Sequence, residues 1–153
     1  MKKVGEYTLR GTLEGESTTP IWDKILLFDG KFTTGYRIVE FVVSAVNSSS
    51  AQDVTGKLAT EPTAVTTIGL GNYWNWADNR EIAWASANNV TSSIREGSFS
   101  LTDPDNLVIE DLYVSVQNNA GSTEQVNYFI KMEKYEFSDS IGALAMVRNR
   151  SQT

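Results

Sequence analysis

Hydrophobic and polar residues alternate with a period of two along three long segments, 36–46, 107–117 and 125–137. Successive side chains of a β-strand point to opposite faces, so this alternation predicts half-buried strands with one face on a core. The segments are also rich in β-branched and aromatic residues, which favour strands. The residues predicted to face the core are Val39, Phe41, Val43, Leu112, Val114, Val116, Val126, Tyr128, Ile130 and Met132.

Shorter apolar stretches bounded by turn residues predict further strands. They lie at 6–13, 25–28, 54–60, 63–68, 81–85 and 98–101. Asp29-Gly30 is typical of a tight turn, and the segment 118–121 predicts a hairpin loop between the two longest strands. Many strands at regular spacing predict an all-β protein. The long strands and long loops favour a jelly-roll-type antiparallel β-sandwich with two sheets of roughly four strands each.

The C-terminal segment favours a helix. Ser138 or Asp139 can cap the run SIGALAMVRNR that follows. Arg148 and Arg150 would lie at the C-terminal end of this helix, where the helix dipole attracts positive charge. Gly142 weakens the helix because glycine loses much backbone freedom there, so an extended tail is the alternative.

The length and composition of the chain limit the architectures and the classes of function that we expect. The length of 153 residues fits one domain, so we expect a single β-sandwich over residues 1–153, in which 138–153 form a short C-terminal helix or arm. The chain has 13 basic and 19 acidic residues and a net charge of −6, which disfavours binding to nucleic acid. No run approaches the ~18 apolar residues of a membrane helix, and no signal peptide is evident, so we expect no membrane insertion.

Cysteine and histidine are both absent from the chain. Disulfides, thiolate nucleophiles, zinc sites and triads that use histidine are therefore excluded. Acid–base chemistry near neutral pH would need a carboxylate or lysine with a shifted pKa. We therefore expect no enzymatic activity, no metal and no cofactor.

Carboxylate chemistry is the remaining catalytic option, because a glycosidase needs two carboxyl groups. The candidate pairs are Glu110 with Asp111, Asp103 with Asp105, and Glu14 with Glu16. Adjacent strand residues face opposite sides, and the aspartates at 103 and 105 flank a proline in a predicted turn. The same turn lacks the glycine and the bidentate glutamate of an EF-hand calcium loop. No catalytic pair or calcium site is thus indicated by spacing alone.

The stretch NYWNWADNREIAWASA, residues 72–87, contains three of the four tryptophans. One interpretation is that these aromatic residues pack over an open end of the sandwich or in a contact between subunits. The alternative is a glycan-binding platform, because Trp74 and Trp76 would share a face of an extended segment. The side chains assigned to that platform are Trp74, Trp76, Asp78, Asn79, Arg80 and Glu81.

Several phrases of the chain resemble small virion structural proteins of marine tailless bacteriophages and environmental viruses. They are TLRGTLEGE, LLFDGKFTTGYRIVEF, GKLATE, WADNREIAWA, DPDNLVIEDLYVSVQN and QVNYFIKMEKYEFSDSIGALAMVRNRSQ. The resemblance implies a jelly-roll capsid, vertex or decoration protein that is made in the host cytoplasm and resides in the virion. It would act by self-assembly or by binding to other capsid proteins.

This reading predicts a set of contact residues with other subunits. They are Trp74, Trp76, Arg80, Phe129, Tyr135, Ile141, Leu144, Met146 and Val147. The alternative function is a lectin-like β-sandwich module or a receptor-binding head, which would bind glycans through the tryptophan platform.

Overall fold

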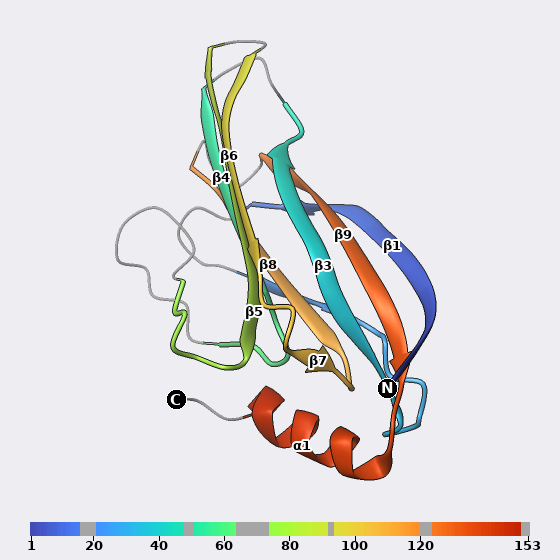
Figure 1. Ribbon diagram of the computed structural model, residues 1–153. Helices are drawn as coiled ribbons and strands as arrows, with labels where there is room; N and C mark the ends of the chain where they lie inside the picture. The colour runs from blue at the N-terminus through green and yellow to red at the C-terminus, as the bar shows by residue number, and fades with distance from the viewer. Residues whose placement is uncertain (16–20, 48–50, 64–73, 92–93, 120–123, 151–153) are drawn as a thin grey trace.

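The computed structural model describes residues 1–15, 21–47, 51–63, 74–91, 94–119 and 124–150. Within these ranges the chain forms two antiparallel sheets that pack face to face, with one helix across the lower end of the sandwich (Figure 1). The strands are β1 Lys2–Glu14, β2 Ile21–Ile25, β3 Thr34–Ala45, β4 Gln52–Ala59, β5 Glu81–Thr91, β6 Ile94–Thr102, β7 Leu107–Val108, β8 Leu112–Asn118 and β9 Gln125–Glu136. The helix is α1, Asp139–Arg150.

The strand order is that of a jelly roll. One sheet has the order β1-β9-β3-β7 and the other the order β2-β8-β4-β5-β6. Successive strands alternate between the sheets from β1 to β4 and again from β6 to β9, so each sheet interleaves strands from both halves of the chain. This is the two-Greek-key pattern of an eight-stranded jelly roll, to which β6 adds a ninth strand beside β5. The predicted all-β jelly-roll sandwich is confirmed.

The core lies between the sheets and contains most of the predicted residues. Phe41, Val43, Leu112, Val114, Val116, Val126, Ile130 and Met132 are all at most 2% exposed. Tyr128 is partly buried and packs against this cluster. The prediction for Val39 is wrong, because a β-bulge between Ile38 and Glu40 shifts the register of β3. Ile38 is consequently buried, whereas Val39 is 38% exposed.

One predicted strand and one predicted hairpin differ from what the structure shows. The strand predicted over 107–117 is interrupted at 109–111, since β7 belongs to the four-stranded sheet and β8 to the five-stranded sheet. The predicted hairpin at 118–121 does not join paired strands, because β8 and β9 lie in different sheets. Of the strand predicted at 63–68, only Thr63 lies within the described residues. Residues 107–111 read Leu-Val-Ile-Glu-Asp, so the alternation lapses at the change of sheet and holds only from Leu112 onward.

The C-terminal segment is helical, as predicted, and the extended tail is excluded. Gly142 is buried against the β2–β3 loop, where an added Cβ atom would lie 2.0 Å from the carbonyl oxygen of Phe32. Two turns later Asn149 is 6% exposed, and its Nδ2 donates to the carbonyl oxygen of Leu107 at 2.8 Å. Its own carbonyl oxygen accepts from Thr60 Oγ1 at 2.5 Å. No helix among the described residues is long and apolar enough to cross a membrane.

Gly142→Ala is expected to lower the free energy of unfolding by about 1–3 kcal/mol, because the methyl group overlaps the backbone of Phe32 and either the loop or the helix must shift. In an unconstrained helix the same change would raise stability by about 0.5–1 kcal/mol. Urea denaturation followed by circular dichroism measures the difference. Ala143→Gly, at an exposed position of the same helix, is the control and is expected to cost about 1 kcal/mol or less. Stabilisation by Gly142→Ala would contradict the close contact.

Candidate functional site

The outer face of the five-stranded sheet carries polar and aromatic side chains in rows that cross the strands. The register aligns one such row across all five strands. Its members are Trp22, Ser115, Lys57, Trp84 and Leu101. Ser115 and Lys57 are completely buried although they point away from the core between the sheets. The alternation of residues predicts that side chains on this outer face are exposed to solvent. The burial of Ser115 and Lys57 could therefore not be predicted from the sequence pattern.

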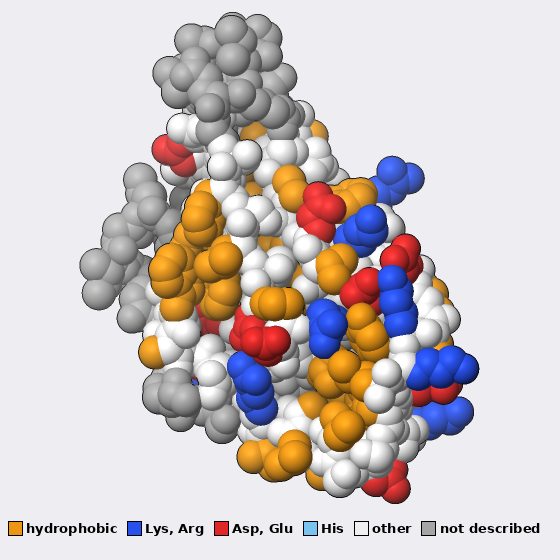
Figure 2. Space-filling model, in the orientation of Figure 1, with side chains coloured by type: hydrophobic (Ala, Val, Ile, Leu, Met, Phe, Trp, Pro, Cys, Tyr) orange, Lys and Arg blue, Asp and Glu red, His pale blue; other side chains and the backbone are white. Residues whose placement is uncertain are grey.

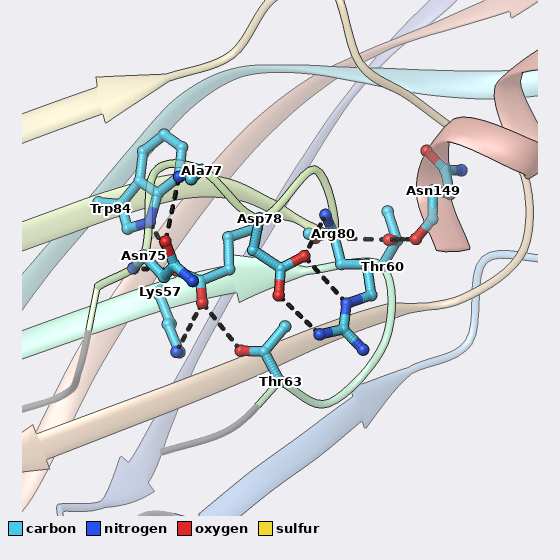
Figure 3. A network of polar contacts seen from close by, with 10 residues as sticks. Lys57, Thr60, Thr63, Asn75, Ala77, Asp78, Arg80, Trp84 and Asn149 are labelled. Carbon is cyan, nitrogen blue, oxygen red and sulfur yellow. Dashed lines mark hydrogen bonds and ion pairs between the residues drawn. The ribbon is translucent and has the colours of Figure 1, made fainter. Parts of the chain in front are cut away.

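A buried ion pair lies at the centre of this face. Lys57 Nζ is 3.0 Å from Glu81 Oε2, and the two side chains are 0% and 1% exposed. Thr63 Oγ1 donates to the same carboxylate oxygen at 3.0 Å. The other oxygen, Oε1, accepts from the backbone N–H of Asn75 and from Trp84 Nε1, both at 3.0 Å. Figure 3 shows these groups converging from β4, β5 and the segment before β5.

The electrostatics of the pair indicate a structural role. Burial lowers the pKa of Lys57, and the negative charge of Glu81 opposes that shift. The ammonium also lies 5.3 Å from the ring centroid of Trp22, in cation–π geometry. The carboxylate accepts four hydrogen bonds and neither side chain reaches solvent, so a substrate has no access to either group. The pair joins β4 to the start of β5, and the hydrogen bond from Asn75 to the same carboxylate ties in the segment that precedes β5.

The Asp-Asn-Arg-Glu run forms a tight turn that leads into β5. Arg80 donates from Nε and Nη2 to the two carboxylate oxygens of Asp78, at 2.9 and 2.6 Å. This guanidinium holds the pKa of Asp78 below its ordinary value. The backbone N–H of Glu81 donates to the carbonyl oxygen of Asp78 at 3.0 Å, and Asn79 accepts from Asn106 Nδ2 at 3.0 Å. Asp78 and Glu81 are each only 2% exposed, so their carboxylates serve the turn.

The two neighbouring tryptophans do not form one platform. Trp74 stacks on Phe99 of β6, with ring centroids 5.7 Å apart, whereas Trp76 meets the edge of Trp84 on β5 at 6.0 Å. Trp76 is 61% exposed, and the buried Nε1 of Trp74 makes no hydrogen bond to the described residues. The glycan platform predicted from the six residues between Trp74 and Glu81 is therefore not assembled as one exposed surface.

A groove of about 350 Å³ lies on the same outer face, beyond the ion pair. Its walls combine side chains of β4, β5 and β6, and Phe99 is the aromatic residue among them. The polar residues that line it are Asp53, Thr55, Ser86, Asn88 and Ser98. Sequence reasoning did not identify this groove. The sequence does show polar residues at alternate positions of two strands, Asp53 and Thr55 on β4 and Ser86 and Asn88 on β5. It does not show that these two strands pair, and the pairing is what brings the residues together.

The outer face of the four-stranded sheet contains two of the predicted contact residues. Phe129 is 37% exposed and borders a groove of about 320 Å³ whose other walls include Arg10 and Val42. Tyr135 is half-buried, and its hydroxyl donates to Glu133 Oε1 at 2.8 Å. The guanidinium of Arg37 lies 4.9 Å from the centroid of the Tyr135 ring. Tyr135 is thus held by its neighbours, while Phe129 presents its ring to solvent.

The predicted contact residues of the helix have different environments. Leu144 and Val147 are 72% and 68% exposed, and Ile141 is 39% exposed. Met146 is half-buried and lies near Asn149 and Thr60 at the foot of the sandwich. The helix therefore exposes three of its four predicted contact residues and turns one inward.

The candidate catalytic and metal-binding carboxylates form no such site within the described residues. No group of three or more Asp or Glu side chains is arranged there to hold a metal ion. Asp103 accepts at Oδ1 from the backbone N–H of Asp105 at 3.0 Å, and its Oδ2 lies 3.5 Å from Arg148. Asp111 accepts from the backbone N–H groups of Leu27 and Phe28 at 3.0 and 3.2 Å. These carboxylates organise loops.

Comparison with protein-family models and with curated proteins gives no match for this chain, so the functional argument rests on its own residues and fold.

Proposed function

We propose that this chain is a virion structural protein, a capsid, vertex or decoration subunit that acts by self-assembly or by binding to other capsid proteins. It catalyses no reaction. The observation that carries the proposal is the presence of exposed apolar side chains on three separate sides of a jelly roll, which is a fold of viral capsid proteins.

The exposed apolar residues are distributed as an assembling subunit requires. Val42 and Phe129 lie on the outer face of the four-stranded sheet, at 36% and 37% exposure. Trp76 and Leu101 lie on the opposite side of the sandwich, over the five-stranded sheet, at 61% and 42%. The helix adds the third side (Figure 2). Single exposed apolar residues are common, but a subunit with neighbours on several sides needs such residues on each of them.

The assembly proposal predicts a specific oligomer in solution, because contacts that close into a ring or shell set a fixed stoichiometry. Sedimentation velocity and native mass spectrometry measure it. Trp76→Ala and Phe129→Ala are expected to weaken the oligomer about tenfold or more, since interface aromatics often contribute over 1 kcal/mol, while the melting temperature changes little. A chain that stays monomeric at high concentration, alone and with candidate capsid partners, would contradict the proposal.

A glycan-binding, lectin-like function is the second candidate, and the groove beside Phe99 favours it. An exposed aromatic ring next to carboxylate, amide and hydroxyl groups offers the combination that binds sugars, since the ring packs on C–H faces and the polar groups bond to hydroxyls. Asp53 and Asn88 are paired across β4 and β5, so their side chains lie on one face. Jelly rolls also occur among lectin domains.

A glycan array separates this candidate from an assembly role. Binding that is lost in Asn88→Ala and Phe99→Ala, but kept in Asn127→Ala on the other sheet, would place a glycan in this groove. Absence of binding in the intact chain would leave assembly as the function that the surface supports.

A further inference from the structure

The helix α1 exposes three of its large apolar residues, whereas the two residues that it buries most fully are Gly142 and Asn149. Leu144 and Val147 are the most exposed of its large hydrophobic residues, at 72% and 68%, whereas Gly142 and Asn149 face the sandwich and are buried. Figure 2 shows hydrophobic side chains gathered at the lower end of the molecule, where Figure 1 places the helix. A surface helix ordinarily turns its apolar stripe to the core. In this orientation the apolar side chains of α1 are exposed and can contact another molecule.

The orientation is held by specific contacts at both ends of the helix. Near its start, the absence of a side chain at Gly142 lets the helix lie against the carbonyl oxygen of Phe32. Near its end, Asn149 bonds to Leu107 and accepts from Thr60. Residues 142 and 149 are two helical turns apart and lie on the same face. Rotation that would bury Leu144 breaks both contacts.

We propose that the exposed stripe Ile141, Leu144 and Val147 packs against the same stripe of a second copy of this chain, with the two helices antiparallel about a twofold axis at Leu144. The proposal rests on the assembly function and names one of its interfaces. In this arrangement Leu144 meets Leu144 of the other copy, and Ile141 lies level with Val147.

The spacing of the stripe is self-complementary. Ile141 precedes Leu144 by three residues and Val147 follows it by three, so the stripe reads alike in both directions. A twofold contact requires a surface of this kind, because the same patch serves both subunits. A partner of different sequence would need no such symmetry.

The distribution of charge also favours a second, antiparallel copy. The chain has a net charge of −6, so two copies repel each other over most of their surface. Residues 140–147 contain no charged side chain, which makes this stripe a place where two copies can approach. The helix begins with Asp139 and carries Arg148 in its last turn. Antiparallel packing sets each acidic end level with a basic end, whereas parallel packing aligns like charges and like helix ends.

Exposed aromatic residues lie in the loop that contacts the helix. A stable dimer buries about 800 Å² on each partner, which is more than one helix stripe offers. Phe32 lies beside Gly142, and its ring packs against that of Phe28 with centroids 5.3 Å apart. Phe32 and Phe28 are 47% and 39% exposed, so the loop that contacts the helix at Gly142 also carries exposed aromatic side chains.

Charge substitution tests whether the stripe is the interface. Leu144→Glu places two carboxylates at the twofold axis and removes the central apolar contact, so the dimer dissociation constant is expected to rise at least about a hundredfold. The melting temperature of the monomer should hardly change, because Leu144 is 72% exposed. Leu101→Glu, on β6, is the matched control and is expected to leave this dimer intact. Sedimentation equilibrium measures both variants.

Cysteine crosslinking tests the geometry, since the chain has no cysteine of its own. Under a mild oxidant, Leu144→Cys is expected to form a disulfide-linked dimer rapidly. Ile141→Cys mixed with Val147→Cys should crosslink as a heterodimer, faster than either variant with itself. Leu101→Cys, which lies on β6 outside the helix interface, should form no disulfide-linked dimer through this interface.

The outcomes separate this interface from the broader function. An oligomer that persists in Leu144→Glu, with no crosslink at residue 144, overturns the helix interface and leaves the assembly proposal standing. Faster self-crosslinking of Ile141→Cys than of its mixture with Val147→Cys overturns the antiparallel arrangement. A wild-type chain that is monomeric at every concentration overturns the self-contact, and if it also binds no capsid partner, the assembly proposal fails with it.

Discussion

Glu81→Ala is expected to lower the free energy of unfolding by about 3–5 kcal/mol, because it leaves the Lys57 ammonium buried without its counter-ion. The substitution also removes the acceptor for Thr63, for the backbone N–H of Asn75 and for Trp84 Nε1. Buried donors without acceptors add to the cost. Urea denaturation followed by tryptophan fluorescence measures the loss, since Trp84 lies within the network.

A double substitution separates the charge from the packing. Lys57→Met with Glu81→Gln removes both charges and keeps similar volumes. The glutamine carbonyl oxygen can still accept from Asn75 and Trp84, so we expect the double variant to recover most of the stability lost in Glu81→Ala. Glu6→Ala removes the exposed ion pair with Lys3 and is expected to leave the urea midpoint almost unchanged, because solvent screens the two charges. A loss below about 1 kcal/mol for Glu81→Ala would mean that the carboxylate is not the centre of the network.

Ile130→Ala is expected to lower the free energy of unfolding by about 2–5 kcal/mol through lost burial and the cavity that remains. Ile130 is completely buried on β9, where it pairs with Leu9 of β1 and Phe41 of β3. The adjacent Phe129 faces outward, so Phe129→Ala in the monomer is expected to cost about 1 kcal/mol or less. Chemical denaturation of both variants compares the two faces of the strand. A larger loss for Phe129 would show a register shifted by one residue.

The period-two pattern predicts the strands and most of the core because side-chain direction in a strand is a local property. In β9, the alternate residues Val126, Ile130 and Met132 are buried as their positions predict. The same reasoning fails at Val39, because a bulge between Ile38 and Glu40 interrupts the alternation there, whereas Phe41 and Val43 beyond it are buried as predicted. The alternation lapses at residues 107–111, where the chain changes sheet between β7 and β8, but the lapse alone does not say which sheet each strand joins.

The candidate sites were less accessible to sequence reasoning. Trp74 and Trp76 attract attention as a pair, but each contacts a different strand, because residues 74–80 turn before β5. The groove beside Phe99 draws polar residues from three strands. The sequence of any one of these strands, taken alone, does not indicate a binding site. Pairing partners in a sheet are set by contacts distant in sequence, and a single sequence does not specify them.

The sequence by itself determines the all-β class, the position of the C-terminal helix, and the absence of cysteine and histidine chemistry. These properties follow from composition and from the local period of side chains. The tertiary structure decides which polar groups are buried and which apolar groups are exposed. Lys57 and Glu81 form their pair across adjacent strands, and Asn149 binds Thr60 although 89 residues separate them. The helix exposes Leu144 because those distant contacts, and not its own hydrophobicity, set its orientation.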